Sequence, residues 1–161
     1  MLAAARIGTL VDVRRFAGSR RNPQFSGEAM GAALAEEGIE YVPMPDLGGR
    51  RAARADSPNL AWRNPAFRGY ADYMATPPYR MAQERLVELA RGRRTAVMCA
   101  EAMWWQCHRS LIADDFKASD WEVIHLMSPG REQEHPYTSA ARIVEGRLDY
   151  TLPADPQAPL F

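Results

Sequence analysis

The sequence has little cysteine, almost no lysine and no long apolar run. Two cysteines in 161 residues are too few for a disulfide scaffold, so a reducing, cytoplasmic setting is expected. No apolar stretch approaches the roughly 20 residues of a membrane span. The N-terminus does not have the pattern of a signal peptide either, because Arg6 interrupts its apolar run and Asp12 ends it. These absences argue against a small secreted protein and against a membrane protein.

The chain also has no net charge, because 20 basic residues balance 20 acidic ones. A uniformly basic surface for nucleic acid is therefore excluded. All basic residues except Lys117 are arginine, which binds phosphates and carboxylates bidentately but is also what GC-rich codon usage produces. The arginines gather in segments 6–21, 50–54 and 91–94. Basic loops are thus predicted in a neutral chain.

A hydrophobic content of 47% suffices for one buried core, and we expect a single domain over residues 1–152 with an extended tail at 153–161. Apolar runs predict strands at 9–13, 39–42, 95–99 (a central strand) and 122–126, a hairpin at 142–150, and helices beginning after Ser26, Asn64, Thr76 and near Cys107, with loops at 16–25, 43–59 and after 126. Strands that alternate with helices predict an α/β fold, with a mostly parallel sheet, helices on both faces and a C-terminal β-hairpin.

The reactive side chains are most concentrated between Cys99 and Ser110. A strand ends at Cys99, a loop follows, and a helix begins near Cys107-His108-Arg109-Ser110. Ligands of open α/β sheets bind at the carboxyl ends of the strands. Amides of a first helical turn, together with an arginine, hold an anion and lower the pKa of a nearby thiol. The candidate catalytic residues are Cys99 as nucleophile, Glu101 as acid, base or orienting group, Cys107, and His108 with Arg109 as anion-holding residues.

Other interpretations of the same residues stay open. Cys99 is equally typical of a small buried residue at a strand end. No metal is the leading expectation, but Cys99, Cys107, His108 and His125 are the types of ligand that zinc uses. A regulatory Cys99–Cys107 disulfide ranks lower in a reducing compartment. His125 is expected to be a hydrogen-bonded core histidine, and no sequence signal gives His135 a role.

Polar and basic residues near the expected carboxyl edge form a candidate anion-binding mouth. Its predicted members are Asp12, Arg14, Ser19, Arg20, Arg21, Asn22, Arg50, Arg51 and Ser110. Such a mouth would attract phosphate-bearing or other anionic substrates. The alternative is that these arginines are ordinary solvated surface residues.

Two resemblances follow from these motifs. The arrangement of a thiol at a strand end, then an arginine and a helix, is similar to that of rhodanese-type sulfurtransferases. Here, however, nine residues separate Cys99 from Arg109. The segments Leu10–Phe16, Ser19–Phe25, Gly38–Tyr41, Leu47–Arg51 and Cys99–Ser110 resemble the family called domain of unknown function 488. That likeness runs from about Leu10 to Tyr150 and implies an α/β fold without an established reaction. Because family members usually begin with another strand and helix, the resemblance also implies that this chain starts after them.

The leading functional hypothesis is a cysteine-centred, arginine-lined anion site that acts on or near nucleic acid, in a repair-associated role. The alternatives are a rhodanese-like sulfurtransferase and a non-enzymatic module recruited to DNA. The tail supports recruitment, because Gln157, Leu160 and Phe161 resemble the short peptide that docks on the bacterial sliding clamp.

Overall fold

The structure, a computed structural model, describes residues 1–18 and 21–153. Ser19 and Arg20 lie outside the described residues, as do the tail residues Gln157, Leu160 and Phe161. Within the described part, the elements are β1 (Thr9–Asp12), the short 3₁₀ helix η1 (Pro23–Phe25), α1 (Gly27–Glu36), β2 (Glu40–Pro43), η2 (Pro45–Leu47), α2 (Pro65–Met74), α3 (Pro77–Gly92), β3 (Thr95–Met98), η3 (Trp104–Gln106), α4 (Arg109–Ala118), β4 (Ile124–Ser128), β5 (Arg131–Glu134), β6 (Arg142–Val144) and β7 (Arg147–Asp149).

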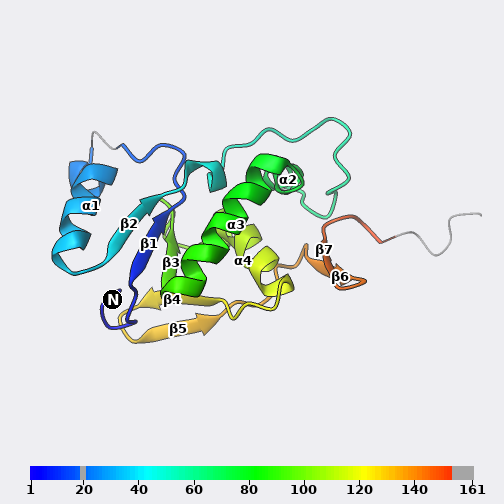
Figure 1. The fold of residues 1–161 in the computed structure, drawn as a ribbon. Helices are drawn as coiled ribbons and strands as arrows, with labels where there is room; N and C mark the ends of the chain where they lie inside the picture. Colours follow the sequence, from blue (N-terminus) through cyan, green and yellow to red (C-terminus); the bar gives the residue numbers. More distant parts are fainter. Residues whose placement is uncertain (19–20, 154–161) are drawn as a thin grey trace, which may run out of the picture.

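A three-stranded parallel sheet with the order β2-β1-β3 is the frame of the molecule (Figure 1). Val11 of β1 is in register with Val42 of β2 and with Val97 of β3. The predicted α/β fold is thereby confirmed in its coarse form. The prediction that 95–99 is the central strand is wrong. Every residue of β1 is buried and that strand takes the middle place, whereas every residue of β3 is only half-buried.

The predicted strand at 122–126 exists as β4 but does not join the parallel sheet. It pairs antiparallel with β5, so that Ile124 lies opposite Glu134 and His125 opposite Gln133. The sequence analysis assigned β5 to a polar loop, because Arg131–Glu134 contains no apolar residue and all four positions are exposed. A strand formed only by pairing leaves no hydrophobic pattern in the sequence.

The helices begin where the sequence predicted, although the Thr76 side chain makes no capping hydrogen bond to α3. The Ser26 side chain accepts a hydrogen bond from the Ala29 amide, and the Asn64 side chain accepts one from the Ala66 amide. Gly38, which follows α1, has φ +70°, a conformation that favours glycine. α1 packs beside β2 and has no fully buried residue. That helices cover both faces of the sheet stays a prediction.

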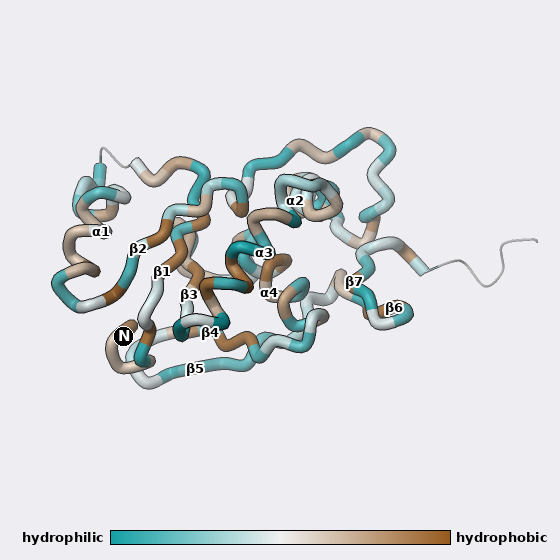
Figure 2. The backbone as a smooth tube through the Cα atoms, viewed as in Figure 1, coloured by the Kyte–Doolittle hydropathy of each residue, from teal (hydrophilic) through white to brown (hydrophobic). Residues whose placement is uncertain are grey.

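The main core joins the sheet to α2, α3 and α4. Its fully buried members include Val11, Leu47, Tyr70, Tyr79 and Leu111. Figure 2 shows that hydrophobic residues are concentrated along the parallel strands and α4, whereas the residues of β5 are hydrophilic. The predicted C-terminal hairpin is confirmed as β6 and β7, with Glu145 and Gly146 at positive φ in its turn. Among the described residues, no helix has the length and apolarity to cross a membrane.

Candidate functional site

The carboxyl ends of the three parallel strands converge on one edge of the sheet. β1 ends at Asp12, β2 at Pro43 and β3 at Met98, and the chain continues from there into the basic loops and into Cys99. The Val13 amide donates to the Met98 carbonyl (3.0 Å), which holds the exits of β1 and β3 together. This edge is where a parallel α/β sheet binds its ligands.

The two cysteines meet at this edge. The structure joins Cys99 and Cys107 as a disulfide, a pairing that the sequence analysis ranked low. Glu101 Oε2 lies 2.9 Å from Cys99 Sγ, so in the reduced form the thiol donates to the carboxylate. Both cysteine residues are buried, at 9% exposed for Cys99 and 2% for Cys107, whereas Glu101 is exposed. The carboxylate therefore connects the sulfur pair to solvent.

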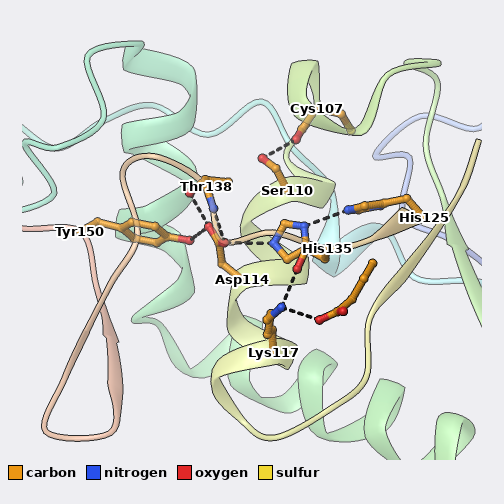
Figure 3. Close-up of polar contacts among 9 residues, drawn as sticks. Cys107, Ser110, Asp114, Lys117, His125, His135, Thr138 and Tyr150 are labelled. Atoms are coloured by element: carbon orange, nitrogen blue, oxygen red, sulfur yellow. Dashed lines mark hydrogen bonds and ion pairs between the residues drawn. The ribbon is translucent and has the colours of Figure 1, made fainter. Parts of the chain in front are cut away.

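Cys107 lies at the N-terminus of α4. Its Sγ accepts from the Arg109 amide at 3.5 Å, and its carbonyl accepts from the Ser110 hydroxyl at 2.9 Å (Figure 3). An unpaired amide of a first helical turn stabilises negative charge. The local geometry thus favours a thiolate on Cys107 in the reduced form. Ser110 itself is 1% exposed and serves this loop rather than an external ligand.

His108 packs between the sulfur pair and the basic loops. Its Nδ1 lies 3.5 Å from Cys107 Sγ, and its ring lies 4.9 Å from the Tyr70 ring. Burial, followed by the charge of Arg109, lowers the pKa of His108 to about 4. At neutral pH the imidazole is therefore uncharged and adds no positive charge for an anion.

Arg109 braces the loop before it. Its Nη2 donates to the carbonyls of Glu101 (2.6 Å) and Ala102 (3.4 Å), which fixes the segment that presents the carboxylate. Burial lowers the pKa of Arg109, although the Glu101 carboxylate opposes that shift. Arg109 thus positions Glu101 and keeps positive charge near the sulfurs.

The loop after β2 brings further arginines to the same edge. An added Cβ on Gly49 would lie 2.8 Å from His108 Nδ1, and one on Gly48 would lie 3.0 Å from the Arg15 amide nitrogen. These close approaches require glycine at both positions. Arg15 Nη1 donates to the Arg50 carbonyl at 3.1 Å, and both arginines are exposed. Of these two, only Arg50 belongs to the predicted mouth; the prediction did not include Arg15, which contacts it here.

Arg51 has a different role from Arg50. Its guanidinium lies 3.6 Å from the centroid of the Tyr73 ring, and it donates to the carbonyls of Gly48 and Asp46. These contacts hold the loop and leave little of the guanidinium for a ligand.

Asp12 and Arg14 form a closed pair. Arg14 donates through Nε and Nη2 to the Asp12 carboxylate and through Nη1 to the Phe25 carbonyl, and the Tyr41 hydroxyl donates to Asp12 Oδ2. Burial raises the pKa of Asp12, but the hydrogen bonds from Arg14 and Tyr41 outweigh it and leave that pKa below its usual value. The pair anchors the exit of β1. Arg21 is exposed, and Asn22 precedes η1.

Sequence reasoning missed a second polar cluster, which Figure 3 shows. Asp114 of α4 is fully buried and accepts from His135 Nε2 (3.0 Å), Tyr150 OH (2.8 Å) and both the amide and the hydroxyl of Thr138. His135 Nδ1 in turn lies 2.8 Å from His125 Nε2. We call these five residues the Asp114 network. Its members lie up to 36 residues apart, so no local motif marks them.

The cysteine loop and the Asp114 network touch through Trp104. Its ring stacks on His125 with centroids 4.3 Å apart and planes 2° from parallel. Burial, followed by His135 and Arg109, lowers the pKa of His125 to about 4. His125 is thus hydrogen-bonded as the sequence predicted, but it is half-buried and is not a member of the core. Among the described residues, it does not belong to the group of metal-ligating side chains at the sulfurs.

The sulfur pair could also bind a metal ion. One ligand atom from each of Cys99, Glu101 and Cys107 lies within 4.8 Å of the other two. Two sulfurs and a carboxylate oxygen are donors that zinc accepts. Of the predicted ligands, this group contains Cys99 and Cys107 but neither His108 nor His125, and Glu101 supplies the third ligand atom.

Comparison with known proteins gives one match. A family model described as domain of unknown function DUF488 matches residues 1–116. No curated protein matches the chain, and no solved structure does. The matched residues contain the whole cysteine loop and Asp114, but not His125, His135 or Tyr150.

Proposed function

Since the chain belongs to the domain of unknown function 488 family, whose description gives no reaction, we propose from the site itself that this protein is a thiol-dependent sulfurtransferase acting on a small anionic sulfur donor. The observation that supports it best is the pairing of Cys99 with both Cys107 and the Glu101 carboxylate. A second thiol in contact with the first has a chemical role when the first forms a bond to sulfur. Phosphoryl or glycosidic chemistry gives the second thiol none.

In the proposed first step, Cys99 attacks the outer sulfur of a donor such as thiosulfate. Its proton passes to Glu101, 2.9 Å away, as the new sulfur–sulfur bond forms. The sulfur–sulfur bond of the donor breaks, and sulfite leaves with the electron pair. Cys99 then holds a persulfide. Arg15 and Arg50 at the mouth attract the dianionic donor and its anionic product.

Two second steps are open to this persulfide. An external nucleophile such as cyanide takes the outer sulfur and restores the Cys99 thiolate. Without an acceptor, the Cys107 thiolate attacks Cys99 Sγ, hydrogen sulfide leaves, and the disulfide present in the structure forms. An added thiol reductant then regenerates the dithiol. The amide of Arg109 stabilises the Cys107 thiolate for that step.

The test is the rate of thiocyanate formation from thiosulfate and cyanide by the reduced protein. Cys99→Ser should lose activity by about 10³-fold or more, and Glu101→Gln should lose about 10²-fold. Glu84→Gln, an exposed glutamate on α3, is the matched control and should keep full activity. Full activity in a folded Cys99→Ser protein would exclude the proposal.

The anion-binding mouth has a test of its own. A double variant Arg15→Met, Arg50→Met should raise KM for thiosulfate about tenfold while kcat changes little, because the arginines act on binding. Arg63→Met, an exposed arginine, is the control. An unchanged KM in the double variant would remove both arginines from the site.

A zinc centre is the second candidate. The Cα atoms of Cys99 and Cys107 are 7.7 Å apart, wider than the roughly 4.4–6.8 Å of most disulfides. A metal ion between the sulfurs would suit that span, with Glu101 as a third ligand. Metal analysis of protein purified without chelator separates the candidates: one zinc per chain, lost in Cys99→Ser, favours the metal.

A role on nucleic acid stays a proposal that rests on the tail. The clamp-type residues Gln157, Leu160 and Phe161 lie outside the described residues. Calorimetry of the intact protein against a bacterial sliding clamp tests them. Binding of micromolar order that Leu160→Ala, Phe161→Ala abolishes would support recruitment, and no binding by either protein would exclude it.

A further inference from the structure

A cavity of about 440 Å³ separates β3 from β4. Its lining includes all four residues of β3, Leu10 of the neighbouring β1 and the first residues of the chain, Met1 and Leu2. Side chains of Leu10, Ile112, Phe116, Trp121 and Val123 give it an apolar wall. This volume falls within the roughly 300–1,000 Å³ of small-molecule sites.

One corner of the cavity is polar. Trp104, Arg109 and His125 line it together, and Trp104 stacks on His125. Arg109 is close enough for its charge to act on His125. Within the described part of the chain, Trp104 Nε1 and Arg109 Nε are buried and have no hydrogen-bond partner. Buried donors without acceptors cost stability, so two of them in one corner point to an acceptor that a ligand supplies.

The Asp114 network holds His125, the third residue of this corner, in place. Asp114 accepts from His135 Nε2, so that nitrogen carries a proton. His135 Nδ1 lies 2.8 Å from His125 Nε2, so one of these nitrogens donates to the other and the His125 ring is held in place. A rigid imidazole stacked on an indole gives this corner flat walls.

The charges on the cavity wall favour an anion. Arg94 and Arg109 line it against the single carboxylate of Glu122, and His125 is uncharged at neutral pH. We propose that this cavity binds a small carboxylic acid with a flat apolar body, whose carboxylate accepts hydrogen bonds from Arg109 and Trp104. The site is separate from the proposed sulfur chemistry and shares with it only the loop between Cys99 and Arg109.

The experiment uses 2-naphthoate as the probe and calorimetry of the full chain as the measurement. 2-Naphthamide has the same shape without the charge and should bind about tenfold more weakly, because its contact with Arg109 is no longer charge-assisted. Ala96→Leu, which fills the cavity from β3, should weaken naphthoate binding by about tenfold or more. Ala33→Leu, an exposed site on α1, is the matched control.

A second cavity-filling variant protects the test against misfolding. Ala90→Leu fills the cavity from α3, where leucine is a good helix former, and circular dichroism checks the fold of each variant. Loss of naphthoate binding in both filled variants, with thiocyanate formation retained, supports the site. The proposal is overturned if naphthoate does not bind, if the filled variants bind as well as Ala33→Leu, or if the amide binds as tightly as the acid.

Discussion

The cysteine loop and the Asp114 network are neighbours in space but differ in how the sequence encodes them. The cysteine loop is one continuous segment, and its chemistry is visible as Cys99, Glu101, Cys107, His108 and Arg109 in eleven consecutive positions. The Asp114 network collects single residues from α4, β4, a loop and the chain after β7. A reactive site can be recognised when its polar residues are close together in the sequence, whereas a buried polar network can be recognised only in the folded structure. We expect the first region to determine activity and the second to determine stability.

The largest expected effect on stability belongs to Asp114. Asp114→Ala leaves His135, Thr138 and Tyr150 without their shared acceptor in a fully buried place. The free energy of unfolding should fall by about 3–5 kcal/mol. Urea unfolding measures it, with Glu84→Ala as the exposed control. A loss of unfolding free energy below about 1 kcal/mol in Asp114→Ala would contradict the proposal that the Asp114 network determines stability.

Gly49 tests whether the cysteine loop depends on close packing. Gly49→Ala places a Cβ 2.8 Å from His108 Nδ1, so the imidazole beside Cys107 must move. We expect a loss of about 1–3 kcal/mol and slower thiocyanate formation. Gly18→Ala is the matched control, because an added Cβ there meets nothing within 4 Å. Equal behaviour of the two variants would show that the loop tolerates displacement of His108.

Two half-buried histidines, His108 in the cysteine loop and His125 in the Asp114 network, predict a pH dependence of stability. The pKa values of His108 and His125 fall from 6.5 to about 4 on folding, so the unfolded chain binds more protons between these values. Their contribution to stability is present above pH 6.5 and is lost as the pH falls toward 4. Urea midpoints at several pH values measure this loss. His125→Phe should flatten the profile, and a profile identical to that of the unmodified protein would contradict the assignment.

Arg51 gives the smallest expected effect. Arg51→Met removes the contact with the Tyr73 ring and two hydrogen bonds to loop carbonyls, and should cost about 1 kcal/mol. Arg50→Met, next to it and exposed, should cost less than about 0.5 kcal/mol. Thermal unfolding compares the two. A larger loss for Arg50 would reverse the roles given to these arginines.

The sequence predicted the elements that have their own local signals. Caps at Ser26 and Asn64, the stop at Gly38 and the turn at Gly146 depend on neighbouring residues, and the structure confirms them. The partner of β4 could not be predicted, because β5 is polar throughout and exists by pairing. His135 carried no signal for a related reason, since its partners Asp114 and His125 lie 21 and 10 residues away.

Within the candidate site, residue types were easier to predict than their contacts. The segment from Cys99 to Arg109 indicated a site, but not that Glu101 would face Cys99. The arginines near the edge were predicted as one mouth, yet Arg14 is held by Asp12 and Arg51 by Tyr73. Whether a guanidinium meets solvent or an internal acceptor depends on packing, which the sequence does not display.

The most direct test of the account is where sulfur is bound after a single exposure to the donor. Cys107→Ser, reduced and then incubated with thiosulfate without an acceptor, should gain the mass of one sulfur atom, and peptide mapping should place it on Cys99. The serine cannot close the disulfide, so the persulfide should persist. A folded Cys107→Ser protein that gains no sulfur, or that carries it elsewhere than on Cys99, would contradict the central claim.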